Sequence, residues 1–267
     1  MNNLVARAKE LLNSNSVQVV IGYETGPTGV ARPAFITNSE KADRLIYDER
    51  CVQNLAVYLT KHEVRKLGKA AIVATLPVMR SIMMLISEQQ IIGENLVVLG
   101  ISSEGNLLDI ADIRVMQGII EKSDLSNPPE YRELLAALNK MSPEEKFAYW
   151  QKELSKCIKC YACRQACPMC YCTRCTVEVN QPQWIPVQAN THGNMEWHIL
   201  RAMHLAGRCI SCGECGRSCP VGIPCHLLTM HLTDKVFNYF KVYAGTSDKM
   251  SSVMSTYEPN DKESFII

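Results

Sequence analysis

The chain has 267 residues, enough for one large or two modest domains, and 47% of them are hydrophobic, which argues against wholesale disorder. Its formal net charge of +1 at pH 7 argues against nucleic-acid binding through bulk positive charge. The first sixteen residues predict a short amphipathic helix and not a signal peptide. The most apolar stretch, residues 70–86, is interrupted by Pro77 and Arg80. We therefore expect a cytoplasmic protein without a transmembrane segment.

The predicted elements of the first half alternate between strands and helices. Apolar and β-branched runs predict strands over residues 17–24, 34–38, 69–76 and 94–102, with helices over residues 50–66 and 78–91 between them. This alternation is typical of a small α/β layer domain. The composition changes near residues 122–130, so we expect an α/β scaffold or docking domain over residues 1–125.

A glycine-rich stretch, GYETGPTG at residues 22–29, follows the first predicted strand. It lacks GxGxxG spacing, Pro27 argues against a helix opening there, and no Lys-Ser/Thr pair follows as in a phosphate-binding loop. We interpret it as a turn. The alternative is a contact to a nucleotide or a flavin.

The second half is predicted to be mostly helical, with metal-binding loops, over residues 126–245. SPEE at residues 142–145 predicts the start of a helix over residues 143–156, because Ser142 can cap and Glu145 can reach back to the cap amide. We expect a final extended tail, residues 246–267, that lies over a partner.

Two more helices are predicted, over residues 194–207 and 226–245. The first has an apolar face at helical spacing, formed by Met195, Ile199, Ala202, Met203 and Ala206. Gly207 and Gly245 are the predicted stops.

The number and spacing of the cysteines are the strongest indication of function in this sequence. Cys51 stands alone, and the other twelve of the 13 cysteines lie within residues 157–225. Without a secretion signal, a disulfide framework is the weaker alternative to metal binding. CIKCYACRQACP and CISCGECGRSCP both obey C-x2-C-x2-C-x3-C-P, the spacing of the bacterial two-cluster ferredoxin. A structural zinc site uses two CxxC pairs without the proline, so we expect two [4Fe–4S] clusters.

This spacing predicts crossed ligation, since three thiolates wrap one cubane and the fourth ligates the other cluster. The first cluster is predicted to take Cys157, Cys160, Cys163 and Cys219. The second is predicted to take Cys209, Cys212, Cys215 and Cys167. The flanking basic residues either tune the cluster potentials or are ordinary surface charges; they are Lys156, Lys159, Arg164, Arg174, Arg208 and Arg217.

Four cysteines remain outside this pattern: Cys170, Cys172, Cys175 and Cys225. They could form a third metal site, either another [4Fe–4S] cluster or zinc. A histidine could replace one of them, the candidates being His192, His198, His204 and His226. The alternative is that these thiols are reduced, buried and structural.

The cysteine runs, together with CYCTRC, QPQWI and HLAGRC, resemble a family of anaerobic dicluster ferredoxin-type subunits. These are similar to the β subunits of coenzyme F420-reducing hydrogenase and formate dehydrogenase, and they often accompany heterodisulfide-reductase-like flavoproteins. IGYE, ARPAFI, CVQNLAVYL and RSIMMLI extend the resemblance to the first half.

Departures from that family fall in the first half. The resemblance places thiols of many members at the positions of Pro77 and Ser103, whereas Cys51 is retained. If those thiols form a site in relatives, this chain has lost most of it, and Cys51 is a remnant. The resemblance therefore does not carry flavin or F420 binding to this chain.

These features predict an iron–sulfur subunit of a multi-subunit anaerobic oxidoreductase. It would relay single electrons between a flavin- or metal-containing partner, such as a heterodisulfide-reductase-like flavoprotein, and another subunit. The alternative is a flavin-containing catalytic subunit that reduces F420, NAD or a folate-type substrate. A redox-sensing regulator is a third reading, and the chain lacks a DNA-binding signature.

Overall fold

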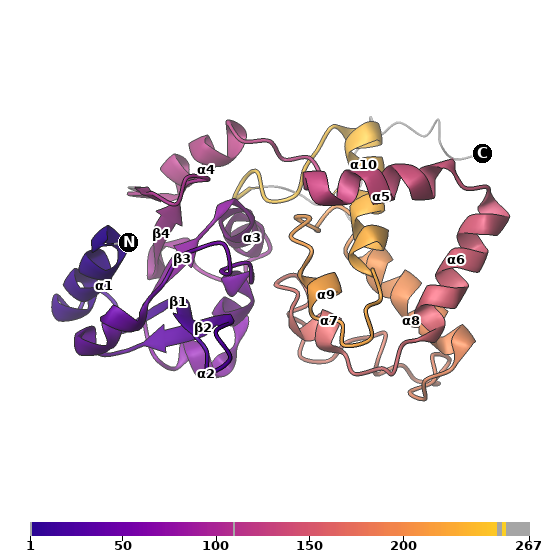
Figure 1. The fold of residues 1–267 in the computed structure, drawn as a ribbon, viewed down its shortest axis with the longest axis horizontal. Helices are drawn as coiled ribbons and strands as arrows, with labels where there is room; N and C mark the ends of the chain where they lie inside the picture. The colour runs from indigo at the N-terminus through magenta and orange to yellow at the C-terminus, as the bar shows by residue number, and fades with distance from the viewer. Residues whose placement is uncertain (1, 109, 250–252, 255–267) are drawn as a thin grey trace. The chain divides into compact units, whose positions relative to one another are not determined.

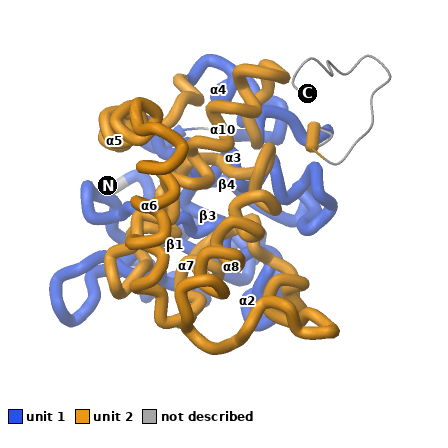
Figure 2. The backbone as a smooth tube through the Cα atoms, turned by 90° about the vertical axis from the view of Figure 1, so that its right-hand side faces the viewer, with its two compact units in different colours: residues 1–123, 245–250 blue, residues 124–244, 251–267 orange. Residues whose placement is uncertain are grey.

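The structure is a computed structural model that describes residues 2–108, 110–249 and 253–254. The chain combines helices with a sheet (Figure 1). It divides into two compact units: unit 1 comprises the residues up to 123 together with residues 245–249, and unit 2 comprises residues 124–244 (Figure 2). Most of the predicted tail, residues 246–267, lies outside the described residues.

Unit 1 holds a five-stranded sheet of order β2-β1-β3-β4-β5. The central strands β1 (Val19–Thr25), β3 (Ala70–Ala74) and β4 (Leu96–Ile101) are parallel, and β2 (Ala31–Ile36) and β5 (Leu107–Leu108) pair antiparallel at the edges. The four predicted strands are confirmed. The fifth strand has only two residues, too few for a pattern to indicate it.

Strands β1 and β3 are buried almost throughout, which shows that both faces of the sheet are covered. Helix α1 (Asn2–Asn13) packs against β1, helix α3 (Leu76–Ser87) against β3, and helix α4 (Ile113–Glu121) against α3 (Figure 1). Short 3₁₀ segments, η1 (Ser39–Arg44) and η3 (Gly93–Asn95), connect these layers.

The helix predicted over residues 50–66 is wrong. The chain forms a 3₁₀ segment, η2 (Leu55–Thr60), and a single turn, α2 (His62–Arg65). The Asn54 side chain accepts the Ala56 N–H at 3.1 Å, which starts the first segment only at residue 55. Lys61 is extended, with ψ 131°, and separates the two segments. A side-chain cap and one extended residue thus override the apolar pattern.

Unit 2 is built from helices and loops, without a strand among its described residues. Its longer helices are α5 (Pro129–Lys140), α6 (Pro143–Ser155), α8 (Thr191–His204) and α10 (His226–Phe240). Two one-turn helices, α7 (Ala162–Gln165) and α9 (Glu214–Arg217), lie side by side within the cysteine runs (Figure 1).

The predicted helices of unit 2 are confirmed with shifted ends. Ser142 and Glu145 form the expected capping box of α6. Asn190 caps α8 through the Gly193 N–H, so this helix begins before residue 194. Helix α10 ends at Phe240, because Lys241 adopts a left-handed conformation (φ 59°) before Gly245 is reached.

The predicted apolar face of residues 194–207 is only partly buried. Ala202 and Ala206 are 5% and 4% exposed, whereas Ile199 and Met203 are 46% and 49% exposed. Trp197, His198 and Arg201 are at most 5% exposed, so this helix also turns polar and aromatic side chains inward.

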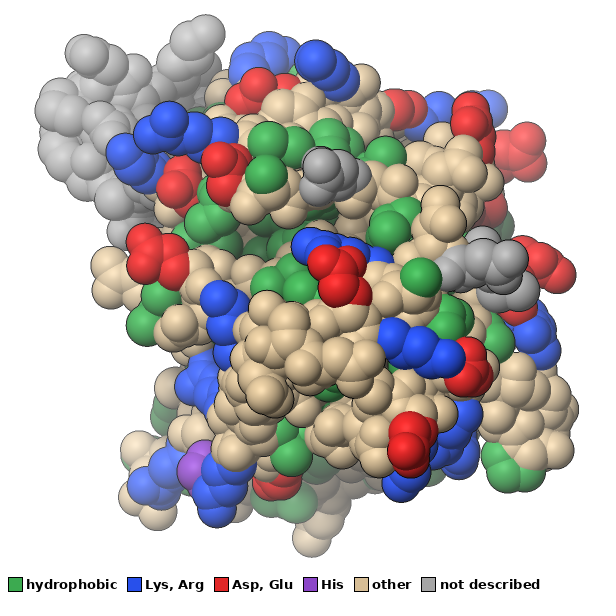
Figure 3. All heavy atoms as spheres, turned by 90° about the vertical axis from the view of Figure 1, so that its left-hand side faces the viewer, with side chains coloured by type: hydrophobic (Ala, Val, Ile, Leu, Met, Phe, Trp, Pro, Cys, Tyr) green, Lys and Arg blue, Asp and Glu red, His purple; other side chains and the backbone are tan. Residues whose placement is uncertain are grey.

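On the face of the molecule drawn in Figure 3, basic and acidic side chains are interspersed with hydrophobic ones. This mixture agrees with the small net charge. None of the described helices combines the length and the apolar character needed to cross a membrane.

Candidate metal centre

The first cysteine run and the end of the second meet at one cavity. Its lining includes Cys157, Cys160, Cys163 and Cys219, the four ligands predicted for the first cluster. Trp197 and His198 of α8 complete the wall together with apolar side chains. The fold thus brings together the predicted set, which comes from both runs.

A second cavity has the reciprocal composition. Cys209, Cys212 and Cys215 line it together with Cys167 from the first run. Thr229 and Met230 of α10 contribute to the same wall. Each cavity therefore takes three cysteines from one run and one from the other, and Cys225, which belongs to neither run, also lines the first.

The two runs repeat an unusual backbone conformation. Lys159 and Tyr161 in the first run have φ of 53° and 58°, and Ser211 and Gly213 occupy the equivalent places with φ of 59° and 75°. Left-handed conformations are rare outside glycine and mark positions that the surrounding structure holds in place. Their repetition indicates that both loops are shaped for the same kind of ligand.

These conformations aim backbone amides at sulfur atoms. The Lys159 N–H donates to Cys157 Sγ at 3.3 Å, and the Ser211 N–H donates to Cys209 Sγ at 3.4 Å. A third amide, of Ile223, donates to Cys219 Sγ at 3.3 Å. Amide donors stabilise thiolates, the form in which cysteine binds metals.

Helix α8 presents three buried nitrogen atoms that have no hydrogen-bond partner among the described residues: Trp197 Nε1, His198 Nε2 and Arg201 Nε. Such groups are costly unless an acceptor is present. Because Trp197 and His198 line the first cavity, the sulfur atoms of an iron–sulfur cluster are suitable acceptors there. The residues present thus fit this cofactor.

Arg201 carries a buried charge among the cysteines. Burial alone would lower its pKa, but the nearby thiols of Cys170 and Cys215 raise the pKa well above its usual value. His198 responds in the opposite way, since burial and the neighbouring Arg201 lower its pKa to about 4. Near neutral pH this histidine is therefore uncharged and the arginine is charged. The cysteine spacing gives no indication of Arg201, because this residue lies between the two runs.

The cations that flank the runs are mostly neutralised or bound locally. Ion pairs join Lys156 to Glu153, Arg164 to Glu178 and Arg217 to Glu214. Lys159 Nζ donates to the Pro186 carbonyl at 2.6 Å, and Arg208 donates to Tyr171 Oη at 3.1 Å. Arg174 is exposed. Because Arg164 and Arg217 also donate to the Cys172 and Cys212 carbonyls of the cysteine loops, both interpretations of these residues stay open.

The four remaining cysteines differ in exposure, although the half-buried Cys175 packs against the same core cluster as the buried Cys225. Cys225 is 2% exposed, lines the first cavity and donates to the Cys215 carbonyl at 3.1 Å. Cys170 is hydrogen-bonded to Cys167, which lowers the pKa of Cys170 to about 6, and Cys172 is exposed. Among the described residues, the eight predicted cluster ligands included, no three Cys, His, Asp or Glu side chains lie close enough to hold a single metal ion, so this finding does not distinguish a third site from the two cavities. The third site stays a prediction.

In unit 1, Pro77 and Ser103 follow the carboxyl ends of the neighbouring parallel strands β3 and β4. Ligand sites of α/β domains lie at such ends. Cys51 is 6% exposed, and its thiol lies 4.0 Å from the Ile46 carbonyl oxygen. Its interpretation as a remnant of a lost site stays a hypothesis.

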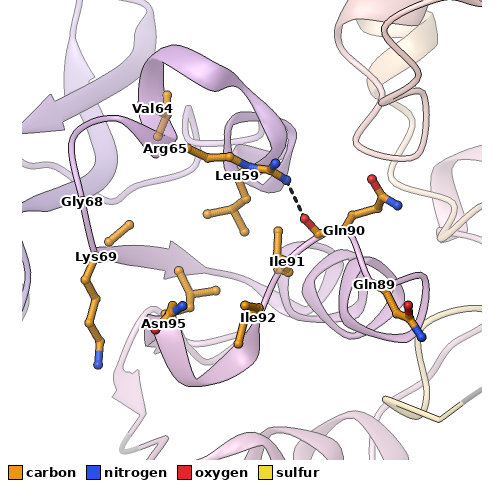
Figure 4. A pocket seen from close by; sticks show the side chains of 12 residues that line it. Leu59, Val64, Arg65, Gly68, Lys69, Gln89, Gln90, Ile91, Ile92 and Asn95 are labelled. Carbon is orange, nitrogen blue, oxygen red and sulfur yellow. Dashed lines mark hydrogen bonds between the residues drawn. The ribbon is translucent and has the colours of Figure 1, made fainter.

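A groove of about 620 Å³ lies in unit 1 (Figure 4). Arg65 reaches across it and donates to the Gln90 carbonyl, and Lys69 and Asn95 lie on its other side. These last two residues immediately precede β3 and β4, so the groove lies at the amino ends of the strands. That is the opposite end from the usual ligand sites of parallel sheets.

Comparison with known proteins agrees with the cysteine geometry. Residues 153–223 match the family model of a 4Fe-4S dicluster domain. This domain includes all eight predicted ligands, and it supports two [4Fe–4S] clusters as the cofactors. The predicted resemblance to dicluster ferredoxin-type proteins is confirmed for this part of the chain.

Two relatives are β subunits of F420-dependent formate dehydrogenases. The chain is 37% identical over 76 residues to the subunit β of Methanocaldococcus jannaschii, which is 28% of this chain and 19% of the relative. It is 50% identical over 28 residues to the formate dehydrogenase 1 subunit β of Methanococcus maripaludis, 10% of this chain and 7% of the relative. The chain thus covers less than a fifth of these relatives.

Proposed function

We propose that this chain is an iron–sulfur electron-transfer subunit of a multi-subunit anaerobic oxidoreductase. The observation that carries the proposal is the pair of cavities, each lined by three cysteines of one run and the last cysteine of the other. This is the ligand exchange of two-cluster ferredoxins. The dicluster domain match supports the same cofactor.

The ligand assignment follows the cavities. Cys157, Cys160, Cys163 and Cys219 would hold the first [4Fe–4S] cluster. Cys209, Cys212, Cys215 and Cys167 would hold the second. Such clusters supply one-electron transfer with little rearrangement, and the shared ligands keep the two sites adjacent.

The protein supplies the ligand thiols and the core that surrounds them. Burial raises the pKa of the Cys209 thiol and raises that of Cys212 to about 12, whereas hydrogen bonding with Cys225 lowers the pKa of Cys215 to about 7. Most of the ligand thiols would therefore release their protons as they bind metal. Buried apolar residues, including Leu154, Ile185 and Ile223, pack in the surrounding core.

The proposed partners are other subunits of a cytoplasmic complex, one of them a flavin- or metal-containing protein such as a heterodisulfide-reductase-like flavoprotein. Support comes from the relatives, which are named as β subunits of formate dehydrogenases and therefore belong to assemblies. Unit 1, in which the groove of about 620 Å³ lies at the amino ends of the parallel strands, is proposed to dock this partner.

The test is chemical analysis of the anaerobically purified chain. We expect about eight iron and eight sulfide per chain, and two interacting EPR signals after reduction with dithionite. Abundant zinc with little iron would refute the proposal. Stoichiometric FAD or FMN would instead support the alternative of a catalytic subunit.

A further inference from the structure

One positive charge lies beside cysteines of both cavities. Arg201 Nη2 donates to the Cys163 carbonyl at 2.9 Å, and its guanidinium lies close enough to the Cys215 and Cys170 thiols to lower the pKa of each. Cys163 lines the first cavity and Cys215 the second. A single side chain on α8 thus lies beside predicted ligands of both clusters.

This charge has no carboxylate partner. Among the residues that the structure describes, no Asp or Glu forms an ion pair with Arg201, whereas Arg164 and Arg217 are each paired with a glutamate. Arg201 is only 5% exposed, and a buried cation without compensating negative charge is strongly destabilising. The Cys170 thiol beside it can supply part of that charge, and ligated clusters would supply more.

The proposed clusters supply that charge. An oxidised [4Fe–4S] cluster with four thiolate ligands carries a net charge of about 2− and becomes more negative on reduction. A fixed cation in a buried, low-dielectric position favours the more negative state. Arg201 also keeps one nitrogen, Nε, without a partner among the described residues, so it retains a donor for a sulfur atom.

We propose that Arg201 raises the reduction potential of both clusters, by stabilising the negative charge that each gains with one electron. The proposal rests on the proposed function, since it requires a cluster in each cavity. No bond forms or breaks in this step: a reductant such as dithionite delivers one electron, and Arg201 stays protonated throughout.

The test is an EPR-monitored redox titration of the anaerobically purified full chain. We expect Arg201→Gln to lower the equilibrium constant for one-electron reduction of both clusters by about tenfold, which is about 59 mV. Arg201→Lys keeps the charge and should stay close to the wild type. Arg174→Gln removes the same charge from an exposed position and should change neither potential, because water and salt screen it.

Iron content distinguishes a failure of the proposed function from a failure of the proposed role of Arg201. A wild-type chain without iron refutes the proposed function before any variant is compared. An Arg201→Gln chain with about eight iron atoms and unchanged potentials refutes the role of Arg201 alone. Equal shifts in Arg201→Gln and Arg174→Gln would also refute it, since they would indicate a general effect of net charge.

A second measurement is needed if the Arg201→Gln variant does not incorporate its clusters. Wild-type protein labelled with ¹⁵N-arginine is reduced and studied by pulsed EPR. We expect a ¹⁵N coupling to the cluster spin that Arg201→Lys abolishes. Absence of the coupling in the wild type, or its persistence in Arg201→Lys, would refute the contact.

Discussion

The thiols of Cys157 and Cys219 line the same cavity, although they begin one cysteine run and end the other. Cys167 and Cys209 have the reciprocal relationship in the second cavity. This exchange distinguishes a pair of linked sites from two independent four-cysteine sites, and it can be tested by combining substitutions.

Cys219→Ala should lower the iron content from about eight to about four atoms per chain, because one cluster loses a ligand. Adding Cys157→Ala should cost no further iron, since both residues serve the same cluster. Adding Cys209→Ala should remove the remaining iron. Iron analysis that gave the reverse order would show that each run ligates its own cluster, and Cys51→Ala in unit 1 is the control that should keep all of the iron.

Cys225→Ala is expected to keep about eight iron atoms. Its thiol donates to the Cys215 carbonyl at 3.1 Å, so the variant should lose about 1 kcal/mol of unfolding free energy in a denaturant titration. Cys172→Ala, at an exposed position, should change neither quantity. If both variants lost the same metal, the third metal site would be established.

Removal of iron with an oxidant and a chelator should unfold the cysteine loops before unit 1. The loops depend on metal bonds for much of their stability, whereas unit 1 has its own apolar core that includes Ile21 and Ile72. Hydrogen-exchange mass spectrometry should show lost protection over residues 157–167 and 209–219. Equal loss over residues 19–25 would contradict the expected independence of unit 1.

Ser142→Ala should lower the unfolding free energy by about 1 kcal/mol without changing the iron content, because it removes the capping box at the start of α6. Circular dichroism during urea unfolding measures the change. The control is Ser103→Ala, at an exposed position outside the helices. A similar loss in both variants would show that the cap itself is not responsible.

Much of this structure could be predicted where the chain obeys a regular pattern. Continuous apolar runs located β1 and β3, since strands buried on both faces need no polar alternation. The cysteine spacing predicted which residues would meet at each cavity. The prediction of a helix over residues 50–66 was wrong, because the Asn54 cap and the extended Lys61 are local features that a periodic pattern does not indicate.

The burial of α8 was only partly predictable, for a different reason. Hydrophobic periodicity groups Ile199 and Met203 with Ala202, but of these three only Ala202 is buried. The interior here contains cysteines for a charged cofactor, so Trp197, His198 and Arg201 face it. A helix that lies between two metal-binding runs could have indicated that some of its polar side chains face the metal sites.

The matched left-handed turns at Lys159 and Ser211 indicate an internal duplication, in which one ancestral loop now occurs twice. Because each copy ends in a cysteine that belongs to the other copy's cavity, neither copy can complete a site alone. We therefore expect that neither cluster can form during synthesis of the chain until both runs have been made.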